Sequence, residues 1–160
     1  AASDVYKRQV NAVQEEVGCI GAGMITYRIQ PDAAICIDVT HATDSPGLDK
    51  GKFGDIKLGK GPAVIHGTAN HPNLVARLEI VADKNKINLQ HEAAGRRTGT
   101  DTDSIYVSRN GVASALVSLP LRYMHSPVET AALSDVEDTI KLLVELIKSL
   151  KPGDSFGHKL

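Results

Sequence analysis

The sequence contains no tryptophan, and aromatic residues make up only 4% of its 160 residues. Side chains that stack on nucleic-acid bases or sugar rings are therefore scarce. Basic and acidic residues nearly cancel, 18 against 19, for a formal net charge of −1. Because a nucleic-acid-binding domain needs a basic surface, we expect no nucleic-acid partner. No apolar run approaches the roughly 20 residues of a membrane-spanning helix, so we expect no membrane partner.

Cysteine is also rare. Cys19 and Cys36 are the two cysteines of the chain, and both lie in apolar surroundings. Two cysteines cannot build the disulfide framework of a small secreted domain, so we predict reduced, buried thiols and a cytoplasmic protein. Residues 1–9 are polar and lack the apolar core of a signal peptide, and we treat them as a candidate non-native leader.

The chain is long enough for one domain with a real core, since a protein of this size buries roughly two-thirds of its unfolded surface. Apolar runs of strand length alternate with segments of helical periodicity, which predicts an α/β fold with a largely parallel sheet. We predict strands at residues 10–14, 33–39, 87–90 and 112–119, helices at residues 24–29, 72–84 and 134–150, and a loop with a short strand at residues 49–61.

Two of these elements allow finer predictions. The nearly continuous apolar run at residues 33–39 is typical of a strand buried on both faces. Ser134 and Glu137 have the spacing of a capping box, which predicts that Ser134 caps the last helix. The apolar face of that helix is predicted to consist of Val136, Ile140, Leu143, Ile147 and Leu150. Residues 152–160 are predicted to form a loose tail.

Acidic residues and one histidine lie where predicted strands end or in a glycine-containing loop. In open α/β sheets, ligands gather beyond the carboxyl ends of the strands. Carboxylates that gather there repel each other unless a cation holds them, and oxygen with imidazole donors suits Zn²⁺ or Co²⁺. An adjacent glutamate pair could divide the work, one binding metal and the other handling a proton. The candidates are Glu15, Glu16, Asp38, Asp101, Asp103 and His125.

Each candidate has a structural alternative. A glutamate pair is commonly solvated surface, Asp38 could cap a turn, and His125 could be a hydrogen-bonded structural histidine. The other histidines of the folded region show no spacing that suggests a site, and we predict structural or supporting roles for them. These are His41, His66, His71 and His91.

Four short motifs occur in order along the chain: VQEEVG at residues 13–18, IDVTHA at 37–42, TGTD at 98–101 and PLRYMHSPVE at 120–129. Together they resemble the glutamyl or tetrahedral (TET-type) aminopeptidases, a family of two-metal peptidases of which some members are labelled endoglucanases. The resemblance covers about residues 10–150. It implies a zinc-peptidase-like, three-layer α/β/α sandwich with a mostly parallel sheet.

The same resemblance implies a function. Two divalent metal ions, Zn²⁺ or Co²⁺, would activate a water that removes N-terminal residues from a peptide substrate. Glu15 matches the general base, Glu16 and His125 match ligands of one metal, and Asp38 matches a ligand of the other. The active-site wall would include Thr98, Gly99, Thr100 and Asp101. The resemblance also implies a homo-oligomer, up to a dodecamer in a full-length parent.

The family has a further histidine and a bridging aspartate upstream of the motifs, and neither is found here. We therefore expect residues 10–151 to be the C-terminal part of a metallopeptidase catalytic domain, incomplete at its N-terminus. The ligands that remain are fewer than the three that a catalytic zinc normally keeps, so this fragment alone is expected to be inactive. Residues 1–9 and 152–160 would lie outside that unit as leader and tail.

Two other functions are considered. An endoglucanase-type glycoside hydrolase needs two carboxylates flanking a sugar and usually aromatic platforms, which this chain has little of. A non-catalytic scaffold or oligomerising domain is favoured by the missing ligands. Hydrolysis of aminoacyl-anilides against cellulose, with and without a chelator, separates the two enzymes, and an upstream reading frame with the missing ligands argues against the scaffold.

Overall fold

The central strand of the sheet is β4 (Ala113–Leu121), and eight of its nine residues are buried. In the computed structural model, which describes residues 6–157, the four-stranded sheet has the order β1-β4-β2-β3. β1 pairs with β4 in parallel, β2 pairs with β3 in parallel, and the short β2–β4 pairing is antiparallel. The other strands are β1 (Ala33–His41), β2 (Ala63–Gly67) and β3 (Gln90–Ala94).

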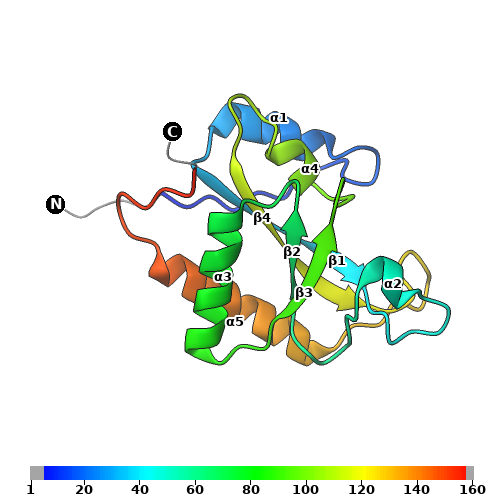
Figure 1. The fold of residues 1–160 in the computed structure, drawn as a ribbon. Coiled ribbons are helices and arrows are strands. Elements are labelled where there is room, and N and C mark those ends of the chain that lie inside the picture. The colour runs from blue at the N-terminus through cyan, green and yellow to red at the C-terminus, as the bar shows by residue number, and fades with distance from the viewer. Residues whose placement is uncertain (1–5, 158–160) are drawn as a thin grey trace.

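Helices cover both faces of this sheet, so the predicted three-layer α/β/α sandwich is confirmed (Figure 1). On one face, α3 (Pro72–Asn85) and α5 (Leu133–Ser149) pack against each other and against β2 and β4. On the other, α1 (Ile20–Ile29) packs on α4 (Thr102–Ile105), and α4 contacts β1 and β4. The short helix α2 (Lys50–Phe53) lies beyond the end of β1.

The larger core lies between the sheet and the pair α3–α5. It includes Val64 and Val117 from the strands and Leu78 and Leu142 from the helices, and all four side chains are 0% exposed. A smaller cluster around Cys36 lies on the opposite face. Burial of this apolar surface, at roughly 25 cal/mol per Å², is the main favourable term in holding the layers together.

The helix at residues 72–84 and the strand at residues 112–119 are confirmed. His71 caps α3 by accepting a hydrogen bond from the Asn73 N–H at 3.3 Å, and Pro72 occupies the first helical turn, where no donor is needed. β4 runs two residues past its predicted end, through Pro120. The strand predicted at 87–90 is displaced along the chain to Gln90–Ala94.

Several strand predictions are wrong. Residues 10–14 form no strand, and Val13 is 65% exposed, because no strand within residues 6–157 pairs with this segment. β1 is not buried on both faces, since Ile37 on one of them is 57% exposed. The loop at residues 49–61 contains α2 instead of a strand, and β2 follows that loop unpredicted.

The predicted capping box is also wrong. The N-cap of α5 is Ala132, with no side-chain cap bond, and Ser134 lies inside the helix. The buried face of α5 is set by α3 and the sheet rather than by the apolar residues alone. It comprises Asp135, Thr139, Leu142 and Leu146, whereas Ile140 and Ile147 are exposed.

The segment after α5 is packed rather than loose over its described part. Phe156 is 8% exposed and belongs to the larger core, and its carbonyl accepts a hydrogen bond from the Asn73 side chain. Asp154 forms an ion pair with Arg77 of α3 at 3.1 Å. The predicted leader and tail reach into residues 1–5 and 158–160, which lie outside the described residues. Across residues 6–157, no helix is both long and apolar enough to cross a membrane.

Candidate functional site

Glu15 and Glu16 lie in a tight turn directly before α1. The Cys19 N–H donates to the carbonyl oxygen of Glu15 at 2.9 Å, and the Gly21 N–H donates to the carbonyl oxygen of Val13 at 3.0 Å. A Cβ atom at residue 21 would clash with that Val13 oxygen, so the close approach of the two backbones requires glycine. The turn therefore fixes where the two glutamates stand relative to the sheet.

Asp38 stands near the carboxyl end of β1 and is partly buried. The Val39 N–H donates to its Oδ1 at 2.7 Å. Burial raises the pKa of Asp38 above its ordinary value, and the nearby charge of Glu16 adds to the rise while His125 opposes it. The strand-averse aspartate is thus held within electrostatic range of the glutamate turn and of the histidine.

His125 follows β4 on a loop with an unusual backbone, since its φ is 60°. The backbone N–H of His125 donates to Oε1 of Glu129 at 2.6 Å, and this hydrogen bond holds the loop in its conformation. Its Nε2 atom lies 3.5 Å from Oε1 of Glu16. The loop after β4 therefore brings an imidazole nitrogen close to a carboxylate oxygen of the turn before α1.

Residues 98–101 form a hydrogen-bonded loop beside α4. Asp103 accepts from the Thr98 N–H at 3.0 Å and from the Gly99 N–H at 2.9 Å, so it closes the loop from within. Asp101 occupies the N-cap position of α4 but makes no cap bond. Its Oδ1 atom is buried and has no hydrogen-bond partner in residues 6–157. Burial, reinforced by Asp38, raises its pKa.

These segments surround one cavity of about 770 Å³ at the carboxyl ends of β1 and β4. Of the eight residues that were assigned roles from the sequence, seven line this cavity. The eighth, Asp101, does not line the cavity but contributes charge near it. Asp103, which was assigned no role, also lines the cavity. The seven are Glu15, Glu16, Asp38, Thr98, Gly99, Thr100 and His125.

Glu92 is a cavity residue that the sequence did not reveal. It lies on β3, where its Oε2 accepts a hydrogen bond of 2.6 Å from the Thr40 hydroxyl of β1. Burial raises its pKa, and the Thr40 bond opposes the rise. The predicted strand ended at residue 90, so Glu92 belonged to no predicted element, and no spacing in the sequence connects it to the glutamate pair.

The charges of the site explain why a cation suits it. Burial raises the pKa of Glu15, and Asp38 and Glu16 raise it further. The carboxylates thus destabilise one another's charged forms, and Asp101 has a buried oxygen without a donor. Carboxylate oxygens together with the His125 imidazole are donors that Zn²⁺ or Co²⁺ accepts. The residues present therefore fit divalent metal ions.

Comparison with known proteins agrees with this picture. A sequence profile described as M42 glutamyl aminopeptidase matches residues 4–142. The lysyl aminopeptidase of Pyrococcus furiosus is 44% identical over 152 residues, which are 95% of this chain and 42% of that protein. Both are named as aminopeptidases. Two solved structures that the chain resembles are titled a putative peptidase/endoglucanase and an endoglucanase, with TM-scores of 0.64 and 0.56, but the family match supports a peptidase and not a glycoside hydrolase.

Solved structures show the same relationship. The aminopeptidase APDkam598 from the archaeon Desulfurococcus kamchatkensis superposes with a TM-score of 0.81 and 37% identity, over 88% of this chain and 41% of that one. The TET1 peptidase of Pyrococcus horikoshii, described as able to assemble into a tetrahedron or a large octahedral shell, gives 0.71 and 31%, over 87% and 40%. This chain thus spans about two-fifths of the length of the relatives that it matches. It belongs to the M42 glutamyl aminopeptidase family.

Proposed function

We propose that this chain supplies catalytic and metal-binding residues of a metal-dependent aminopeptidase that removes N-terminal residues from peptides. The observation that carries the proposal is the convergence of Glu15, Glu16, Asp38 and His125 on one cavity in a chain of this family. Four donor side chains from three separate segments meet there, and the carboxyl groups lie close enough to raise one another's pKa.

Glu15 is proposed as the general base. Burial and the neighbouring carboxylates raise its pKa, and a carboxylate that lines the cavity beside the proposed ligands can take up a proton and release it again. It would accept a proton from the attacking water and pass it to the amine nitrogen as the peptide C–N bond breaks. The Cys19 thiol, 3.7 Å from Oε1 of Glu15, helps to hold that oxygen in place.

Glu16 and His125 are proposed as ligands of one metal ion and Asp38 as a ligand of a second, with Thr98, Gly99, Thr100 and Asp101 as the wall beside them. Bound Zn²⁺ or Co²⁺ would polarise the scissile carbonyl and lower the pKa of the attacking water. Three protein ligands shared between two ions leave each ion with fewer than the three protein ligands of a catalytic zinc site. We therefore propose that turnover needs further ligands from outside residues 10–151, the C-terminal part of the catalytic domain.

The proposed setting is a cytoplasmic homo-oligomer acting on peptides. Its support is the large assembly described for the TET1 relative and the dodecamer described for another TET1 structure. The two cysteines of the chain are too few for a disulfide framework, which supports a reducing compartment. Of the two thiols predicted to be buried, Cys36 is buried and Cys19 is only partly buried.

The test is Glu15→Gln in the longest gene product that contains this chain. Glutamine keeps the shape of the side chain but cannot take up a proton, so kcat on aminoacyl-anilides should fall by at least about 100-fold. Zn²⁺ or Co²⁺ stoichiometry, measured by inductively coupled plasma mass spectrometry, should stay at the wild-type value. Glu137→Gln is the matched control, since Glu137 is an exposed glutamate of α5 that does not line the cavity.

Wild-type kcat in the Glu15→Gln variant would refute the assignment of the base. Loss of metal together with activity would make Glu15 a ligand instead. If the wild-type protein with metal hydrolyses no anilide or peptide and a chelator changes nothing, the chain is a scaffold rather than part of an enzyme. The 160-residue chain alone is expected to show no turnover with added Zn²⁺ or Co²⁺.

A further inference from the structure

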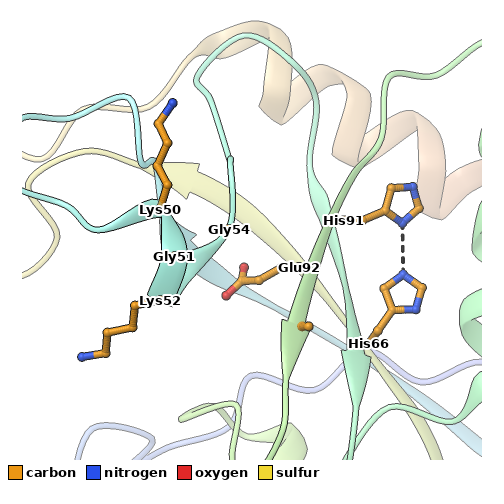
Figure 2. Close-up of a pocket in the computed structure, with 8 residues that line it drawn as sticks. Lys50, Gly51, Lys52, Gly54, His66, His91 and Glu92 are labelled. Carbon is orange, nitrogen blue, oxygen red and sulfur yellow. Dashed lines mark hydrogen bonds between the residues drawn. The ribbon is translucent and has the colours of Figure 1, made fainter.

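A second group of metal-ligating side chains lies outside the cavity. His66 on β2 and His91 on β3 point to the same side of these neighbouring strands, and Glu92, next to His91, points to the opposite side (Figure 2). Glu79 reaches the two rings from α3. The parallel β2–β3 register places Val64 opposite His91, so His66 is the diagonal neighbour of His91 on the same face.

The three donor atoms form a nearly regular triangle. His66 Nε2 lies 3.0 Å from His91 Nδ1, 3.6 Å from Oε1 of Glu79, and the His91–Glu79 distance is 3.5 Å. Three ligand atoms of a tetrahedral zinc, each about 2.0–2.1 Å from the metal, stand about 3.3–3.4 Å apart. The triangle therefore matches the base of a zinc tetrahedron without movement of the backbone.

The position of Glu79 also favours a shared cation. Its Oε1 is almost equidistant from the two imidazole nitrogens, and both distances exceed the roughly 2.7–3.2 Å of a good N–H···O bond. The carboxylate thus faces the midpoint of the histidine pair instead of bonding one ring. Each side chain is partly solvated, with 45% exposure for His66, 38% for Glu79 and 53% for His91, so a water can take the fourth position.

We propose that His66, Glu79 and His91 form a Zn²⁺ site separate from the Glu15–His125 cavity. The ion would tie the edge strand β3 to β2 and to α3, three segments that are otherwise joined by the sheet and by apolar packing. It would also fix the strand whose other face carries Glu92 in the cavity. The proposal does not depend on aminopeptidase activity, since its ligands and its readout are different.

The test uses the whole chain with the three proposed metal ligands of the cavity removed. In the background Glu16→Gln, Asp38→Asn, His125→Gln, isothermal titration with ZnCl₂ should still find one equivalent, and Zn²⁺ should raise Tm. Adding His66→Gln and His91→Gln should weaken this binding by at least about 100-fold and abolish the rise in Tm. Glu79→Gln should weaken it as well, whereas Glu137→Gln, which changes an exposed glutamate of α5, should not.

A second measurement keeps the proposal testable if the background variant does not fold. In the unmutated chain, two-dimensional ¹H–¹⁵N spectra of the imidazoles should show the His66 and His91 resonances shifting with Zn²⁺. Zinc binding that is unchanged by the His66→Gln/His91→Gln pair, or zinc shifts confined to His125, would overturn the proposal.

Discussion

Asp135 offers the sharpest test of how this fold is held together. Its side chain is 0% exposed on the first turn of α5, where it accepts hydrogen bonds from the Gly59 and Gly61 N–H groups, both at 2.8 Å. These bonds fix the loop that leads into β2. In Asp135→Ala the helix is retained, but two backbone donors lose a charged acceptor.

The magnitude follows from the burial of each donor. Gly61 is buried and no water can replace the lost acceptor, so its unpaired N–H costs about 2–3 kcal/mol. Gly59 is exposed, so water replaces most of its bond and the loss is about 1 kcal/mol or less. The sum predicts a fall of about 3 kcal/mol in the free energy of unfolding. Asp135→Asn keeps one acceptor oxygen, so it should lose about half as much.

Urea denaturation followed by far-ultraviolet circular dichroism measures the three free energies of unfolding. The exposed neighbour Glu137 provides the control, since Glu137→Ala should change stability by less than about 0.5 kcal/mol. Hydrogen exchange gives a local readout, because the Gly61 N–H should exchange much faster in Asp135→Ala. An alanine variant as stable as the control, with the Gly61 amide still protected, would refute this account of the loop.

Two further predictions concern the glutamate turn and the loop after β1. Gly21→Ala should destabilise the chain by about 1–3 kcal/mol, because the added Cβ clashes with the Val13 carbonyl. Gly23→Ala in the same helix is the control and should be neutral or stabilising, because a Cβ there meets only ordinary contacts. Equal Tm changes in the two variants would contradict this account. Asp44 has a lowered pKa because Arg122 donates to it, so its contribution to stability is present above its unfolded pKa and is lost as the pH falls through its folded value. Asp44→Asn should therefore lower Tm at neutral pH and approach the wild type as the pH falls through the lowered pKa of Asp44 in the folded protein, and a Tm difference that stays the same across this acid range would argue against the pair.

The sequence predicts structure well where residues that are close along the chain decide it, and poorly where distant segments decide it. The helix at residues 72–84 was predictable because its apolar period and its Pro72 start are local features. Asp38 and His125 were expected near each other because the carboxyl ends of parallel strands meet at one edge of a sheet, and β1 and β4 are parallel neighbours. The expectation for the glutamate pair rested on the motif order instead, because residues 10–14 form no strand. The motif order also sufficed to predict the family, which the M42 match confirms.

The failures lie where a partner element decides the outcome. Residues 10–14 have the composition of a strand but gain no hydrogen-bonded neighbour in the described sheet. The face of α5 that is buried depends on where α3 and the sheet stand, so Asp135 turns inward and the more apolar Ile140 stays outside. Ser134 loses the capping role because the N-cap of α5 lies two residues earlier, at Ala132.

By itself, the sequence determined the fold class and the family and predicted a metal centre, because periodicity and short motifs depend on residues that are near one another along the chain. Only the tertiary structure decided which polar groups meet. It brought Glu92 to Thr40, Asp135 to the loop before β2, and His66 to Glu79 and His91. The physical reason is that these contacts join residues from different elements, and their distances are set by strand order and helix packing rather than by spacing in the sequence.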